Sequence, residues 1–291
     1  MRATGFLAAA LVIISVSSCF LTSAEGWSNG GYSSNPDTPD PGTHDWIAVE
    51  ALSLQTGDVT FLSTTYSSTY KLGTEAPDNP DYIGDTSKHH VYFHADGSLQ
   101  DNASALRASQ MYSIALGYLK QGDKRSAAYD IGVMSHYISD VGVFGHTMGA
   151  HTDWGAEVHH SDYENTIESL KGTLLLPSGQ TLGNSSAYDA TLSLARYVTF
   201  GHDSIQTNIW MDAHYDFSDP AFKTSALASV YESVWAVASA INHLITEVSS
   251  TPTPAPAPAP LDSLVLMAIA VLAGVGATTG GLLAWRSRKA R

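Results

Sequence analysis

Five residues between positions 136 and 164 have the types and the spacing of metal ligands. They follow the pattern His136-x3-Asp140-x5-His146-x13-His160-x3-Glu164. The first pair and the last pair are each four residues apart, a spacing that puts both side chains on one face of a helix. An imidazole and a carboxylate one turn apart can hold a cation such as zinc from one side. One such pair alone is more often structural, but five ligand-type residues at these offsets indicate a metal site.

The segments upstream contain three more residues of the same kind. His44 follows Pro41-Gly42-Thr43 at the start of a predicted helix. Asp78 follows Ala76-Pro77 in a predicted turn, and His90 comes twelve residues after Asp78. If the chain folds back on itself, these residues can join the five above.

Some histidines compete for one role. As metal ligand we favour His90 over His89, because His89 is less well placed before the aromatic pair Tyr92-Phe93. We favour His160 over His159, because only His160 has a carboxylate four residues later. The remaining histidines lack partners at metal-ligand spacing and are expected to be surface or core residues: His94, His151, His202, His214 and His243.

The composition excludes several classes of protein. Of 291 residues only one is a cysteine, Cys19, so the fold is not built on disulfides. Asp and Glu outnumber Lys and Arg by 28 to 14, and the net charge of -14 disfavours a nucleic-acid scaffold held by phosphate contacts. With 44% apolar residues the chain can bury a core, which argues against disorder throughout. The 12 histidines stand out against only 14 basic residues.

The N-terminal residues 1–26 read as a signal peptide for export. Arg2 supplies the positive end, an apolar run extends from Phe6 to about Val16, and small residues follow. Cleavage after Ala24 and cleavage before Trp27 both fit this pattern. A third interpretation is a lipoprotein-type box in which Cys19 is the lipidated residue.

The C-terminal end reads as a membrane anchor. Residues 251–260 alternate proline with small residues, which favours a stiff polyproline II stalk. We assign 261–285 to a transmembrane helix, because Leu264 to Trp285 carry no charge and can span about 30 Å of hydrocarbon. The basic residues of 286–291 predict a cytoplasmic tail. The body of the protein is therefore expected at the cell surface, outside the membrane.

The remaining residues, 27–250, are predicted to form one all-α domain. Apolar residues recur at helical spacing in six segments, and alternating strand-like runs are rare. Two long loops, 28–42 and 73–87, are rich in Gly, Pro, Asn and Asp and need ligands such as metal ions to hold them. The six predicted helices cover 44–54, 102–120, 124–139, 163–171, 186–200 and 225–248.

These motifs resemble those of the zinc-dependent phospholipase C enzymes of bacteria, which are related more distantly to the S1/P1 nucleases. The resemblance rests on Gly42-Thr43-His44, on Asp78-x11-His90, on the five-residue pattern, and on a tryptophan close after the signal peptide. In that family the mature chain begins with tryptophan, whose amino group and carbonyl oxygen bind metal, so the resemblance favours cleavage before Trp27. It implies three zinc ions held by Asp78, His90, His136 and Asp140; by His146, His160 and Glu164; and by Trp27, His44 and the shared Asp140.

The resemblance implies hydrolysis of the glycerol-side phosphodiester of phospholipids, with a phospholipid membrane as partner. Three divalent ions outweigh the charge of three carboxylates, so the site is cationic inside an acidic domain, as a phosphodiester requires. Asp78 is the expected catalytic residue that orients or deprotonates the attacking water. Two alternatives stay open: a nuclease or other trinuclear-zinc phosphodiesterase, which would bind nucleic acid, and a non-catalytic surface module stabilised by metal. Choline preference is in doubt, because Asn79 and Ser87 stand where choline-cleaving members have aromatic residues.

Overall fold

The computed structural model describes residues 27, 36 and 41–250. The predicted signal peptide, stalk, transmembrane helix and tail lie outside the described residues, so anchoring and cell-surface location stay predictions. Among the helices that the structure describes, none is both long and apolar enough to cross a membrane.

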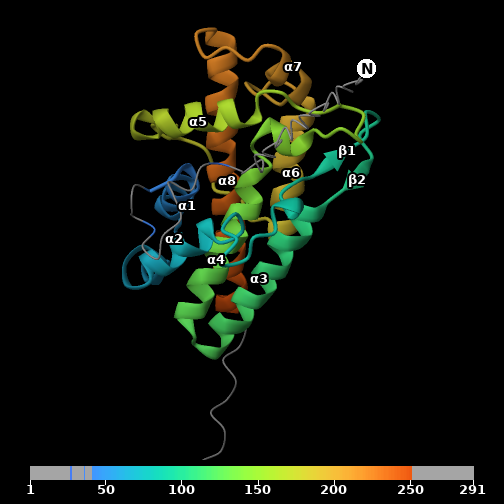
Figure 1. Ribbon diagram of the computed structural model, residues 1–291. Helices are drawn as coiled ribbons and strands as arrows, with labels where there is room; N and C mark the ends of the chain where they lie inside the picture. Colours follow the sequence, from blue (N-terminus) through green and yellow to red (C-terminus); the bar gives the residue numbers. More distant parts are fainter. Residues whose placement is uncertain (1–26, 28–35, 37–40, 251–291) are drawn as a thin grey trace, which may run out of the picture. The chain divides into compact units, whose positions relative to one another are not determined.

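The described part of the chain is mostly helical, and its helices pack around α4 (Figure 1). The α-helices are α1 (Thr43–Ser53), α2 (Ser67–Glu75), α3 (Ala103–Gln121), α4 (Lys124–Asp140), α5 (His160–Leu170), α6 (Ala187–Phe200), α7 (Asn208–Ala213) and α8 (Pro220–Ser250). The short elements are the π-helix η1 (Phe61–Thr65), the 3-10 helices η2 (Thr86–Lys88), η3 (Phe144–Thr147) and η4 (Lys171–Thr173), and the strands β1 (Tyr92–Phe93) and β2 (Leu99–Asp101).

Helix α4 is the central element because its C-terminal half is buried on all sides. Every residue from Asp130 to Asp140 is buried, as expected for a helix that is enclosed by neighbours rather than facing solvent. The Asp123 side chain begins the helix by accepting from the Ser126 amide, and Gly122, with φ of 81°, turns the chain from α3 into α4. Figure 1 shows α2 on one side of α4 and α3 on the other.

Helices α2 and α4 cross with their backbones in contact. A Cβ atom on Gly73 would lie 2.2 Å from the Tyr129 carbonyl oxygen, and one on Gly132 would lie 2.0 Å from that of Tyr70. Only glycine permits this approach. It brings the end of α2, and with it Thr74, against the face of α4 that carries His136.

Helix α8 supplies much of the apolar core. Its buried residues recur every three or four positions, among them Phe222, Val230, Val234, Ile241 and Leu244. The resulting stripe packs into the core formed by the other helices.

The predicted all-α class is correct in the main, with one addition and several missed elements. The structure pairs β1 with β2 as a small antiparallel sheet in which Tyr92 faces Asp101. All six predicted helices are present, although α5 and α8 begin earlier than predicted. Helix α2, whose serines, threonines and glycine are weak helix formers, takes up the start of the predicted loop 73–87, and η1 and α7 were also missed. Most of the predicted loop 28–42 lies outside the described residues.

Candidate metal centre

The candidate site is centred on the C-terminal end of α4, where His136 and Asp140 lie one turn apart and are fully buried. His136 Nε2 is 3.0 Å from Asp140 Oδ2. On the other side of the ring, His136 Nδ1 donates to the Thr74 carbonyl oxygen at 2.6 Å. Because a carbonyl only accepts, this bond keeps the proton on Nδ1. The Nε2 lone pair is left facing Asp140, the usual arrangement of a metal-binding imidazole.

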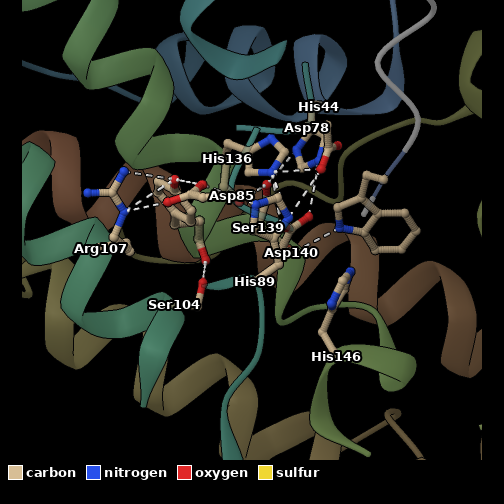
Figure 2. A network of polar contacts seen from close by, with 12 residues as sticks. His44, Asp78, Asp85, His89, Ser104, Arg107, His136, Ser139, Asp140 and His146 are labelled. Carbon is tan, nitrogen blue, oxygen red and sulfur yellow. Dashed lines mark hydrogen bonds and ion pairs between the residues drawn. The ribbon is translucent and has the colours of Figure 1, made fainter. Parts of the chain in front are cut away.

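Three side chains from α1 and from the segment between α2 and β1 surround this pair (Figure 2). His44 Nε2 lies 3.1 Å from Asp140 Oδ1, and its ring stacks on the ring of His136 with centroids 4.0 Å apart. Asp78 Oδ1 lies 3.8 Å from His136 Nε2. His89 Nδ1 lies 2.9 Å from Asp140 Oδ2 and 3.2 Å from Asp78 Oδ1. Both oxygens of Asp140 therefore face imidazole nitrogens.

A second group consists of His146, His160 and Glu164. His160 Nε2 is 2.7 Å from Glu164 Oε1, and His146 Nε2 is 3.8 Å from the same oxygen. Glycine is required at Gly145, because a Cβ there would lie 2.5 Å from the Cγ of His160. These three side chains are 5–6% exposed, against 0–4% for the first group. The second group is thus slightly more exposed than the first.

The structure places His90 outside both groups and His89 in the first, opposite to the order of preference that the sequence suggested. The chain bends at His89 directly after η2, and the two neighbouring histidines lie in different surroundings. His89 points inward and is fully buried. The His90 ring stacks on Tyr92 with centroids 4.3 Å apart, and its Nε2 lies 3.3 Å from the half-exposed carboxylate of Asp101.

Trp27 lies beside both groups. Its buried indole donates from Nε1 to the Ser139 carbonyl oxygen at 2.8 Å, one residue before Asp140. The same ring lies 5.4 Å from the ring of Tyr163, one residue before Glu164. The predicted metal contacts belong to the amino group and carbonyl oxygen of Trp27, so its ligand role stays a prediction even though its side chain reaches the centre.

Burial and mutual charge set the protonation of the first group and of His146. Burial lowers the pKa of His44 and the pKa of His146, so both imidazoles keep a free lone pair at neutral pH. Burial would raise the pKa of Asp140, but the neighbouring imidazoles, His136 foremost, hold it well below its usual range. Asp140 therefore carries a full negative charge in the interior.

The protonation of His160 and Glu164 differs from that of the first group. Burial raises the pKa of Glu164 to about 8. Burial would lower the pKa of His160, but Glu164 and Glu157 raise it to about 10. The pair thus carries at least one proton at neutral pH, which a bound cation would displace.

The arrangement of the donor atoms fits metal ions. Among the described residues, several buried atoms of the two groups have no hydrogen-bond partner: His44 Nε2, both oxygens of Asp140, His146 Nε2, His160 Nε2 and Glu164 Oε1. Buried polar atoms are nearly always paired in proteins, and convergent lone pairs are satisfied by a cation. Two ligands of one tetrahedral zinc ion lie about 3.3 Å apart, given bonds of about 2.0 Å. Nitrogen and oxygen donors without thiolate suit catalytic zinc.

The ligand atoms fall into three sets, each with all its atoms within 4.8 Å of one another. The set of His146, His160 and Glu164 is the one predicted. The other two sets differ from the predicted ones. One consists of His44, Asp78 and His136, and the other of His89, His136 and Asp140. His44 therefore lies against Asp78 and His136 as well as against Asp140, with which the prediction grouped it.

The sequence analysis did not predict the residues that contact these imidazoles on the side away from the centre. Ser139 Oγ lies 3.0 Å from His44 Nδ1, and Glu157 Oε1 lies 3.4 Å from His160 Nδ1. Asp85 lies next to His89 on the side away from the centre. Glu157 precedes His160 by three residues and Asp85 precedes His89 by four, so the spacing that identified the ligands also held a signal for these two carboxylates.

A pair of variants tests the assignment of His89. His89→Ala should weaken zinc binding by more than the roughly 10- to 100-fold that loss of an outer partner causes. His90→Ala should leave zinc affinity unchanged, because its ring contacts Tyr92 and Asp101 instead. Zinc affinity is measured by competition with a chromophoric chelator. Equal losses in the two variants would contradict the assignment.

The comparisons with known proteins gave matches among solved structures. No protein-family model and no curated protein matches the chain. Alpha-toxin from Clostridium absonum matches 72% of this chain at 18% identity, with a TM-score of 0.54. The match spans 65% of that toxin, slightly less than two thirds of its length. Alpha-toxin from an avian strain of Clostridium perfringens matches 78% of this chain and 67% of its own, at 15% identity and a TM-score of 0.49.

At this level of identity the likeness concerns the fold. It agrees with the resemblance to bacterial zinc-dependent phospholipase C enzymes that the sequence motifs predict. Over 72% of its length the chain therefore has a fold similar to the matched part of the Clostridium absonum alpha-toxin.

Proposed function

We propose that this protein is a zinc-dependent phospholipase C that hydrolyses the glycerol-side phosphodiester of phospholipids. One observation carries the proposal: five buried histidines and three buried carboxylates converge within an alpha-toxin-like fold. They come from α1, α4, α5, η3 and the segment between α2 and β1, which are far apart in the sequence. A role in stability alone does not require so many ligand-type side chains at one place.

The residues divide the work of the reaction between them. Zinc ions held by these ligands would supply positive charge for the phosphodiester and would lower the pKa of a water molecule. Asp140 belongs to the set with His89 and His136 and directs its other oxygen toward His44 of another set, so it would lie between two ions. We assign to Asp78 the orientation of the attacking water and acceptance of its proton, as the resemblance implies, and at 4% it is the most exposed residue of the first group.

The surface beside the more accessible group favours a lipid substrate. Val158, two residues before His160, is 75% exposed, and Ile209 on α7 is 44% exposed. The two lie near each other, because the carboxylate of Asp212, three residues after Ile209, accepts from the Val158 amide at 2.9 Å. Exposed apolar side chains near the site suit a lipid surface better than a polyanion, and the net charge of -14 also repels nucleic acid.

The test is a substrate panel combined with a metal count on the purified full chain. Phosphatidylcholine, phosphatidylethanolamine and phosphatidylglycerol vesicles are assayed for diacylglycerol and phosphorylated head group, beside single-stranded DNA and RNA. We expect close to three zinc ions per chain, lipid cleavage that stops with a chelator, and recovery with zinc. Nucleotide release without lipid cleavage would establish the nuclease alternative instead. A metal-loaded protein inactive on every substrate would support the non-catalytic module.

A further inference from the structure

We propose that Asp85 and Arg107 are positioning residues that fix the ring of His89 for metal binding. They would link α3 to the metal centre through Nε2 of His89, the ring nitrogen on the side away from the centre. We call this chain of contacts, from Arg107 through Asp85 to His89, the relay. This inference rests on the metal centre proposed above and not on its substrate.

His89 differs from the other four histidines in the nitrogen that it directs inward. His89 directs Nδ1 toward Asp140 and Asp78, at 2.9 and 3.2 Å. The other imidazoles approach the carboxylates of Asp140 or Glu164 with Nε2. If His89 Nδ1 binds a metal ion, its Nε2 must carry the proton. That Nε2 is buried and has no hydrogen-bond partner among the described residues.

Asp85 is the group placed to accept this proton. Its Oδ1 lies 3.7 Å from His89 Nε2, slightly beyond hydrogen-bond distance. A shift of less than about 1 Å closes this gap. The result is the carboxylate–histidine–metal arrangement that orients imidazole ligands and raises their basicity.

Two residues from different helices hold Asp85 in this orientation. Arg107 on α3 lies with Nε 2.9 Å from Asp85 Oδ2 (Figure 2). The hydroxyl of Tyr137 on α4 donates to Asp85 Oδ1 at 2.5 Å. The Arg107 guanidinium also lies 5.3 Å from the Tyr137 ring centroid, within range for a cation–π contact. The carboxylate therefore has little freedom to turn away from His89.

The same residues restrain the histidine ring and balance its charge. The Tyr137 ring meets the His89 ring edge-on, with centroids 5.4 Å apart and an angle of 87° between the planes. Arg107 neutralises Asp85, so the relay supplies an acceptor without adding net negative charge to the metal centre. This distinguishes Asp85 from Asp78 and Asp140, which face the centre directly.

Metal binding by full-length variants tests the relay. Asp85→Ala and Arg107→Ala should weaken Zn²⁺ binding at one site by roughly 10- to 100-fold, as loss of an outer partner does elsewhere. Asp85→Asn keeps an acceptor oxygen and should lose less than Asp85→Ala. Arg125→Ala, which removes an exposed arginine from neighbouring α4, is the matched control and should bind as the unmodified protein does. Affinity is measured by chelator competition with Zn²⁺ alone.

Loading with Co²⁺ separates positioning from general loss of stability. Asp85→Ala should change the visible absorption of the bound Co²⁺, because a turned imidazole alters the ligand field, while Arg125→Ala should not. Unchanged affinity and an unchanged Co²⁺ spectrum in Asp85→Ala would overturn the proposal. If Asp85→Ala does not fold, the same two readouts on Asp85→Asn and Tyr137→Phe decide the question. No lipid enters these measurements, so failure of the phospholipase assignment and failure of the relay are separate results.

Discussion

Removal of metal should lower the midpoint of thermal unfolding by about 10 °C or more. Zinc at about 1,000 times its dissociation constant stabilises the folded state by about 4.1 kcal/mol per site. For a domain of this size each kcal/mol shifts the midpoint by about 2–4 °C, so loss of one site gives about 8–16 °C and loss of all sites gives more. The measurement is a thermal melt of the full chain with and without a strong chelator.

The size of this effect follows from what the ligands connect. His44 belongs to α1, and Asp78 and His89 belong to the segment between α2 and β1, which has little regular structure of its own. All three meet Asp140 or His136 on α4. Without a cation, only the neighbouring imidazoles stabilise the charge of the fully buried Asp140.

Adding zinc back provides the control for the thermal melt. Zn²⁺ in excess over the chelator should restore the original midpoint, whereas Ca²⁺, which prefers six to eight oxygen ligands, should not. A midpoint that does not move on chelation, in a sample shown to have lost its metal, would contradict the idea that these residues form a structural metal centre.

The pairs on helices could be predicted because helix geometry is local. His136 and Asp140, and likewise His160 and Glu164, are four residues apart, and any helix through them puts both side chains on one face. The structure has these helices, and each pair comes to 3.0 Å or closer. Gly145 lets His146 join the second pair, because its backbone lies against the ring of His160.

The ligands on irregular segments could not be predicted with the same accuracy. Choosing between His89 and His90 requires the direction of one side chain where the chain leaves η2, and no periodic pattern sets it. The crossing of α2 and α4 was missed for a related reason. Gly73 lowers helix propensity, but it permits the backbone contact with Gly132 that compensates for this. Tertiary contact decides both cases, and composition does not reveal it.

Replacement of Asp140 should disturb more than one metal ion, whereas replacement of His146 should disturb one. Asp140 belongs to the set with His89 and His136, and its Oδ1 also faces His44 of another set, so Asp140→Asn removes a charge that adjoins two ligand sets. His146 belongs to one set only. We expect Asp140→Asn to lose close to two zinc ions per chain and His146→Ala to lose one, as measured by elemental analysis after dialysis.

Asp130→Asn is the matched control for Asp140→Asn. Asp130 lies on the same helix, is 9% exposed, and belongs to none of the three ligand sets. Burial raises its pKa to about 6, so a neutral amide is well tolerated there and the metal count should not change. Equal small losses in Asp140→Asn and His146→Ala would show that Asp140 does not join two sets. A large loss in Asp130→Asn would show that the metal count follows the stability of α4 rather than the ligands.

If the counts instead fall as expected, hydrolysis should decline by roughly 10²- to 10³-fold or more in both ligand variants, because each removes charge stabilisation from the reacting phosphodiester.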